Sequence, residues 1–237
     1  MKLNFPNTLR SLIVAGLLTS TSFTIAHASN SGMLITEWMY NGSGTGSIGE
    51  FVEFTNFGPT AIDMTGWSFD DDSRTPGSQS LSAFGTIASG ESVILTDSTA
   101  AAFRTSWGLS ASVKVIGGNT NNLGRADEIN LYNNLGALID RLTYNDQATS
   151  GNTKGPRTAG VSGEALNASV LGTNNASQWT LSTVGDKEGS FTSSLGEIGS
   201  PGKTSFVSAV PEPQSYALMM AGLGLIGFMA GRRKKNS

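Results

Sequence analysis

The chain has 237 residues and a formal net charge of −3, but its charges are unevenly distributed. All 18 acidic residues lie between positions 29 and 213 together with nine of the 15 basic ones, so that segment has a net charge of −9 and disfavours binding to nucleic-acid phosphates. The chain has no cysteine and its single histidine is His27, which excludes Ser-His-Asp and Cys-His nucleophiles and His/Cys zinc sites from everything after that position.

The first 28 residues have the three parts of a secretory signal peptide. Two basic residues precede an apolar run over 12–18, and the segment ends in the A-x-A cleavage site made by Ala26 and Ala28. We therefore expect signal peptidase to cut after Ala28, which leaves Ser29 as the mature N-terminus.

The segment that follows predicts an all-β domain. Seven short β-prone runs are separated by turn residues, a spacing typical of a β-sandwich. The runs are 33–38, 51–55, 66–69, 91–96, 113–116, 128–132 and 137–144. Without cysteine no disulfide supports this domain, so its stability must come from a hydrophobic core.

Alternation within the runs predicts which side chains are buried. Ile129 and Leu131 alternate with polar neighbours, and Leu138, Leu142 and Tyr144 share one parity. Side chains two residues apart in a strand point to the same face, so both sets are expected to face the core.

The same reasoning assigns three glutamates to the opposite side. Glu37, Glu50 and Glu53 lie in or next to predicted strands, where a carboxylate on the solvent face of a half-buried strand is ordinary. The competing interpretation is that they are surface ligands for a partner.

One hairpin and one helix are also predicted. Residues 133–136 read Asn-Asn-Leu-Gly, a connection that needs positive φ values. The helix runs from Ser98 to Trp107, with Ser98 or Thr99 as N-cap and with Phe103 and Trp107 four residues apart on one face.

Several segments, in this order, resemble the lamin-tail domain family. They are ITEWMYN at 35–41, GEFVEFTN at 49–56, IDMTGW at 62–67, IASGE at 87–91, DEINLYN at 127–133, LID at 138–140 and TYN at 143–145. The resemblance implies an immunoglobulin-like β-sandwich over 29–146, with Asn56 forming a turn and Trp67 buried in the core. Similar bacterial domains look like binding or display units, and no catalytic module accompanies this one.

Asp70, Asp71 and Asp72 are the candidate metal-binding residues. Adjacent carboxylates in a loop are suited to Ca²⁺, which takes about six to eight oxygen ligands. The spacing lacks the glycine and the bidentate glutamate of an EF-hand loop. The competing interpretation is a solvated β-turn that binds no cofactor.

After residue 146 the composition changes to Gly, Ser, Thr and Asn. We expect residues 147–202 to extend the sandwich by one or two strands, one of them over 178–182 with Trp179 packed on the domain. Residues 203–210 are expected to be a linker that lifts the domain away from the membrane.

The last 27 residues have three consecutive parts. They are Pro211, Glu212 and Pro213, then an uncharged apolar run to Gly231, then the basic cluster Arg232, Arg233, Lys234 and Lys235. As a helix the apolar run, about 214–231, would reach roughly 28 Å, which is close to the ~30 Å hydrocarbon core of a bilayer. The basic cluster would be retained on the cytoplasmic side.

This order of parts, over 211–235, resembles the PEP-CTERM sorting signal. The resemblance implies recognition by exosortase, a membrane transpeptidase-like enzyme of Gram-negative bacteria that make exopolysaccharide. It also implies cleavage near the motif and transfer to the cell surface or matrix. The competing interpretation is a plain tail anchor.

Together these features predict an exported, surface-sorted, non-catalytic protein with a binding or structural role in the extracellular matrix or envelope. The expected partners are signal peptidase and exosortase during processing, the membrane before cleavage, and exopolysaccharide or other surface proteins afterwards. Two alternatives stay open: a calcium-dependent exopolysaccharide-binding module, and a hydrolase that uses carboxylates only. An immunoglobulin-like scaffold hosts unrelated functions, so the fold does not choose among them.

Overall fold

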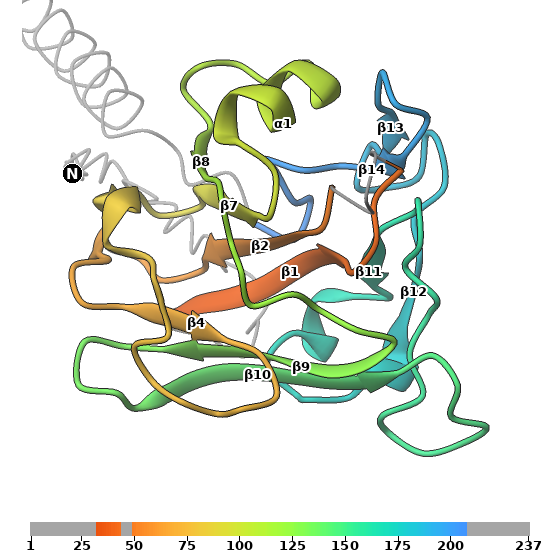
Figure 1. Cartoon of the computed structure of the whole chain (residues 1–237), viewed down its shortest axis with the longest axis horizontal. Helices are drawn as coiled ribbons and strands as arrows, with labels where there is room; N and C mark the ends of the chain where they lie inside the picture. The colour runs from red at the N-terminus through yellow and green to blue at the C-terminus, as the bar shows by residue number, and fades with distance from the viewer. Residues whose placement is uncertain (1–31, 44–48, 208–237) are drawn as a thin grey trace, which may run out of the picture.

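The computed structural model of the chain describes residues 32–43 and 49–207, which are organised around two β-sheets (Figure 1). The larger sheet has, in spatial order, β12 (Trp179–Leu181), β11 (Gly163–Ala165), β1 (Met33–Met39), β2 (Phe51–Asn56), β7 (Ser92–Thr96) and β8 (Lys114–Ile116). The smaller sheet has β10 (Leu138–Asn145), β9 (Ala126–Tyr132), β4 (Ser68–Asp70) and β5 (Gln79–Ser80). Neighbouring strands are antiparallel except β7 and β8, which are parallel.

The remaining elements are short. Two further strand pairs are β3 (Ile62–Asp63) with β6 (Thr86–Ile87), and β13 (Phe191–Thr192) with β14 (Ile198–Gly199). The helical elements are α1 (Ala100–Trp107) and the 3₁₀ turns η1 (Ser82–Phe84), η2 (Ala168–Val170) and η3 (Ala176–Gln178). Within the described residues no helix is long and apolar enough to cross a membrane. The membrane span expected over about 214–231 lies outside them.

The main core lies between the two sheets, and the alternation predicted most of its members from the smaller sheet. Ile129, Leu131, Leu142 and Tyr144 are all buried in it. Leu138 is an exception, with 44% of its surface exposed, and here the prediction was wrong. The pairing of β9 with β10 shifts register between Leu138 and the buried Asp140, and such a shift breaks the alternation of faces.

The predicted hairpin connects β9 to β10. Asn133 donates its backbone N–H to the carbonyl of Ala137 at 3.0 Å, and Gly136 has a φ of 72°. The side-chain oxygen of Asn133 accepts the N–H groups of Leu135 and Ala137. The turn therefore uses both an asparagine cap and the positive φ that glycine tolerates.

Asn56 closes the turn after β2, as the resemblance implied. Its amide donates to the carbonyls of Thr60, Ile87 and Ala88, and its Oδ1 accepts the N–H of Gly58 at 2.8 Å. This side chain is fully buried, and it satisfies backbone groups of two separate loops.

Trp67 was expected in the core, but it is only partly buried and packs against the edge of the main core. Phe69, two residues further along in β4, is fully buried instead.

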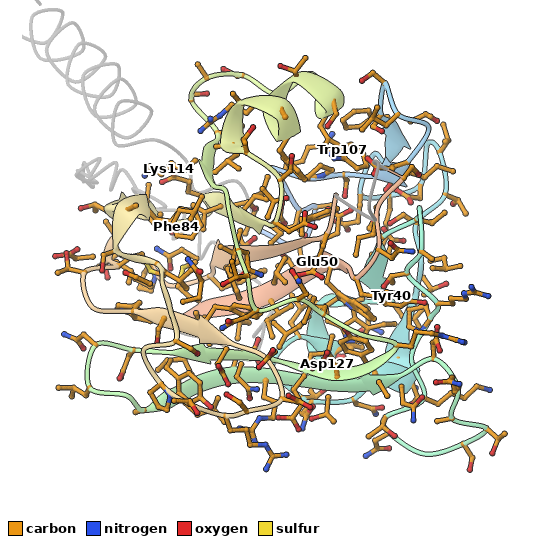
Figure 2. The ribbon with its side chains drawn as sticks, viewed as in Figure 1. Tyr40, Glu50, Phe84, Trp107, Lys114 and Asp127 are labelled. Carbon is orange, nitrogen blue, oxygen red and sulfur yellow. The ribbon has the colours of Figure 1, made fainter. Side chains whose placement is uncertain are left out.

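Helix α1 covers the outer face of the larger sheet, on the side opposite to β9 and β10 (Figure 1). Thr99 is its N-cap and accepts the N–H of Ala102 at 3.2 Å, and Gly108 ends the helix with a φ of 60°. Phe103 and Trp107 pack on Phe51 from β2, and Figure 2 shows Trp107 beneath the helix. A second, smaller core therefore forms outside the sandwich.

The rest of this outer face is polar and also buried, which corrects the prediction for the glutamates. Glu37, Glu50 and Glu53 are at most 3% exposed. Ser200 donates its N–H to Glu37 at 2.7 Å, and Gly202 donates its N–H to Glu53 at 2.6 Å. The C-terminal part of the described chain thus covers a face that the alternation had assigned to solvent.

The segment after residue 146 is therefore built into the sandwich. Strand β11 pairs with β1, and β12 pairs with β11 and has Trp179 buried in the main core. Further along, Ser205 donates its N–H to Glu188 at 2.7 Å, and Phe206 packs against the main core. Residues 203–206 thus belong to the folded body and differ from the linker expected over 203–210.

A chain that ends at residue 146 should fail to fold cooperatively. It would lose five buried apolar residues, namely Ala165, Val170, Leu171, Ala176 and Trp179, and β1 would become an exposed edge strand. Thermal unfolding followed by circular dichroism should show a single sharp transition for residues 29–207 and none for residues 29–146. A sharp transition of the shorter chain within a few degrees of the longer one would contradict this prediction.

Candidate functional site

The residues predicted for targeting lie outside the described part of the chain. These are Ala26, Ala28 and Ser29 at the N-terminus, and Pro211, Glu212, Pro213, Arg232, Arg233, Lys234 and Lys235 at the C-terminus. Their roles stay predictions of the sequence.

Asp70 organises its own loop. It is 1% exposed, and its carboxylate accepts the N–H of Thr75 at 2.8 Å and the hydroxyls of Ser73 and Ser78. Donors of the protein therefore occupy both of its oxygens, as in an Asx-type turn.

Asp71 and Asp72 are more exposed and lie near the smaller sheet. Their negative charges add to burial in raising the pKa of Asp127. Among the described residues no group of three or more His, Cys, Asp or Glu side chains is arranged to hold a metal ion. Calcium binding by Asp70, Asp71 and Asp72 thus stays a prediction that this geometry does not favour.

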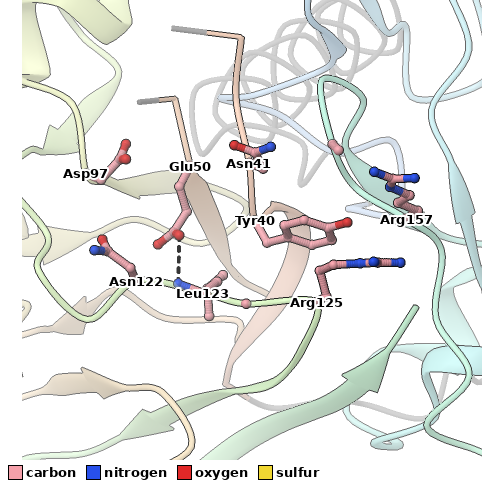
Figure 3. Close-up of a pocket in the computed structure, with 10 residues that line it drawn as sticks. Tyr40, Asn41, Glu50, Asp97, Asn122, Leu123, Arg125 and Arg157 are labelled. Atoms are coloured by element: carbon pink, nitrogen blue, oxygen red, sulfur yellow. Dashed lines mark hydrogen bonds between the residues drawn. The ribbon is translucent and has the colours of Figure 1, made fainter. Parts of the chain in front are cut away.

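A polar pocket of about 320 Å³ is the candidate functional site (Figure 3). It lies where the end of β1, the start of β2 and the segment before β9 meet the loop before β11. The lining residues are Tyr40, Asn41, Glu50, Asp97, Asn122, Leu123, Gly124, Arg125, Arg157 and Ala159.

Arg125 and Tyr40 both line the pocket, and Asp146 connects them. The guanidinium of Arg125 donates from Nε to Asp146 at 2.9 Å, and its Nη2 lies 2.9 Å from the same carboxylate. The hydroxyl of Tyr40 also donates to Asp146, at 2.6 Å. Burial favours the neutral form of Asp146, but the Arg125 and Tyr40 bonds outweigh it and lower its pKa. Burial and the adjacent carboxylate raise the pKa of Tyr40.

Arg157 adds a second cation beside the Tyr40 hydroxyl. Its guanidinium lies close enough to that hydroxyl to act against the rise in the Tyr40 pKa and, unlike Arg125, it forms no salt bridge with any described residue. Figure 3 shows both guanidinium groups on the hydroxyl side of Tyr40. This end of the pocket therefore has two positive charges and one buried negative charge.

Glu50 and Asp97 lie at the other end. Glu50 accepts the N–H of Leu123 at 2.7 Å and the amide of Asn119 at 3.4 Å, which fixes the loop before β9. Burial raises the pKa of Glu50 to about 9, so its carboxyl is neutral at pH 7. Burial also raises the pKa of Asp97.

A second group of carboxyls lies under the C-terminal segment. Glu37 stands directly opposite Glu53 on β2 and Glu164 on β11, so three glutamates form a row across adjacent strands. Burial raises the pKa of Glu37 to about 7 and that of Glu53 well above 4.5, and the charge of Glu37 adds to the effect on Glu53. The oxygens of Glu37 and Glu53 bind protein donors from residues 162 and 200–202, which gives these two glutamates a structural role. The buried Oε2 of Glu164 has no hydrogen-bond partner among the described residues.

The sequence did not predict the pocket. Its two arginines and Tyr40 come from three distant segments, and Arg157 lies in the Gly-, Ser- and Asn-rich stretch over 147–202, for which only one or two extra strands were expected. Tyr40 and Asn41, which follow the first strand, were the signal in the sequence that could have indicated this pocket. Two such residues alone do not identify a binding site.

Comparison with known families agrees with this fold. The model of the Lamin Tail Domain matches residues 26–146, which is half of the chain. The chain belongs to the lamin tail domain family. A second model, the PEP-CTERM protein-sorting motif, matches residues 209–234. No curated protein and no solved structure matches the chain.

Both matched models are of non-catalytic kinds, one a domain and the other a sorting signal. The lamin tail domain match ends at residue 146, whereas the pocket takes Arg157 and Ala159 from beyond it. The pocket therefore joins the family domain to the extension that follows it in this chain.

The free energy of unfolding should fall as pH rises from 5 to 9. Glu37, Glu164 and Glu50 have pKa values of about 7, 7 and 9 in the folded state, against 4.5 ordinarily. A group whose folded pKa is raised stabilises the fold at low pH and loses that contribution as pH rises through the folded value. For Glu50 the loss is about 1.4 kcal/mol per pH unit over this range. Glu53, whose pKa burial also raises well above 4.5, contributes in the same direction. Urea unfolding at pH 5, 7 and 9 measures this.

Two variants identify the source of the slope. Glu50→Gln should flatten the decline above pH 7, because the amide does not titrate. Asp63→Asn should keep the decline, since hydrogen bonds from Thr65 lower the pKa of this exposed carboxyl. Below pH 4.5 the sign reverses, because the Arg74 hydrogen bond lowers the pKa of Glu128 to about 2. A free energy of unfolding that rises between pH 5 and 9 would refute the assignment.

Proposed function

We propose that the protein is exported, processed at its C-terminus by an exosortase-type transpeptidase, and displayed at the cell surface or in the extracellular matrix as a non-catalytic binding or structural protein. The order of the chain carries this proposal. Within the described residues, Phe206 is the last one that packs against the core, and the sorting-motif match begins at residue 209. The packing described for the domain thus involves no residue of the signal that would be removed. The predicted signal peptide over 1–28 supports export.

The non-catalytic part is supported by residue chemistry. After His27 the chain has neither histidine nor cysteine, so an enzyme would depend on carboxyl groups. In the pocket Glu50 has a pKa suited to a general acid, but its two oxygens already bind Leu123 and Asn119. A carboxyl that holds a loop in this way is poorly placed to protonate a substrate. The carboxylate-only hydrolase is therefore the weaker alternative.

The calcium-dependent alternative is also weaker. It relied on Asp70, Asp71 and Asp72, and Asp70 uses its oxygens within its own loop. A binding role that needs no metal fits the polar pocket better.

Intact mass of the protein from cells and from the medium tests the sorting proposal. We expect the mature protein to begin at Ser29 and to end near Pro213. Replacing Pro211, Glu212 and Pro213 with alanine should leave the apolar run and Lys235 attached, because the recognition motif is gone.

The matched control replaces Ser208 with alanine, which changes a neighbouring residue outside the matched motif at 209–234. It should be processed like the natural protein. If Arg232 to Lys235 stay attached in the natural protein as well, the protein is tail-anchored and the surface-release part of the proposal fails.

A further inference from the structure

The pocket around Tyr40 has two chemically different ends. Arg125 and Arg157 lie at the hydroxyl side of Tyr40, whereas Glu50 and Asp97 lie on its other side (Figure 3). A ligand that bridges the two ends needs a negative group on one side and neutral hydrogen-bonding groups on the other.

Arg157 supplies the charge that a ligand would meet first. It is exposed, and no described carboxylate forms a salt bridge with it, whereas Arg125 is 47% exposed and shares Asp146 with Tyr40. A guanidinium has five N–H donors in a planar fork that fits a carboxylate bidentately. Tyr40 donates its hydroxyl to Asp146, and no salt bridge with a described residue engages the guanidinium of Arg157, so its donors are available to a ligand.

The other end offers groups that suit hydroxyls. The side-chain oxygen of Asn41 is buried and has no hydrogen-bond partner among the described residues. A buried acceptor without a partner is costly, and a ligand hydroxyl that donates to it would recover that free energy. Burial raises the pKa of Glu50 to about 9 and also raises the pKa of Asp97, so this end has less negative charge than its composition suggests.

The size of the pocket limits the ligand. About 320 Å³ is at the lower end of the range for small-molecule pockets, roughly 300–1,000 Å³. This space suits one sugar ring and is too small for a folded segment of another protein.

The negative charge of the rest of the domain indicates that an anionic ligand would bind only at this pocket. The segment between 29 and 213 has nine basic residues against 18 acidic ones, and two of the nine line this pocket. An anionic ligand would be repelled by most of the surface and attracted here.

From these observations we infer that the Tyr40–Arg125–Arg157 pocket binds a sugar acid, with the sugar carboxylate on Arg157 and Arg125 and its hydroxyls toward Asn41. The inference deepens the proposed function, because it names the ligand class of a displayed binding protein. It requires no metal ion.

Titration of the protein purified from producing cells, followed by NMR, tests the pocket. D-galacturonate should bind, and neutral D-galactose should bind at least about ten-fold more weakly, because it lacks the charge-assisted bonds. Binding of galacturonate should weaken as sodium chloride is added. Equal binding of the two sugars, or no binding of galacturonate, would overturn the inference.

Arg157→Ala should weaken galacturonate binding by about ten-fold or more. Lys154→Ala is the matched control, because it removes the same charge from an exposed side chain three residues away that does not line the pocket. Both variants should unfold at the temperature of the natural protein, since neither side chain forms a salt bridge in the described structure. If Arg157→Ala binds as the natural protein does, the inference is wrong.

Two further ligands test whether the bound carboxylate belongs to a sugar and whether that sugar is part of a polysaccharide. N-acetylglycine has a carboxylate without ring hydroxyls, and binding equal to that of galacturonate would overturn the assignment to a sugar. Short oligogalacturonates should bind at least as well as the monomer, and tighter binding would indicate a polysaccharide as the source. None of these results depends on C-terminal processing, so a failure of sugar-acid binding is distinguishable from a failure of sorting, which the intact mass measures independently.

Discussion

The architecture depends on two buried glutamates that hold the C-terminal segment against the larger sheet. Glu37 and Glu53 project from adjacent strands on the face opposite the main core, and each accepts a backbone N–H from residues 200–202. A carboxyl group that is buried without hydrogen-bond partners is costly, so these hydrogen bonds stabilise the buried side chains. Removal from water also raises the pKa of each carboxyl group. The segment that supplies these donors is thus as much a part of the fold as β1 and β2.

This attachment gives the larger sheet two covered faces. One end of its outer face lies under α1, where Phe51 and Trp107 meet in edge-on contact with ring centroids 5.9 Å apart. The other end lies under residues 198–204, and the row of Glu37, Glu53 and Glu164 occupies it. The loop before β11 carries Arg157 to the end of β1 because β11 pairs with β1 and Ala159 bridges Asn41. The pocket is therefore a consequence of the strand that the extension adds beside β1.

Much of the fold could be predicted from the sequence because local rules decide it. Strand positions, the hairpin at 133–136 and the Thr99 cap follow from alternation and from turn and capping chemistry. The burial of Glu53 could not be predicted in this way, since an alternating strand has the same pattern whether water or a distant polar segment covers its second face. The predicted burial of Leu138 was wrong for a related reason. A bulge moves a side chain to the other face of the sheet, and the sequence carries no clear sign of it. The pocket needs residues far apart in the chain, and only the tertiary fold brings them together.

The short distance between fold and sorting motif constrains processing. Phe206 packs on the core, and Pro211 is five residues later. A chain extends by at most about 3.6 Å per residue, so the motif lies within roughly 18 Å of the folded body. If the proposed processing takes place, the enzyme would have to bind the motif within this distance of the lamin tail domain. The folded body would then limit how closely the enzyme can approach, because so few residues separate the motif from Phe206.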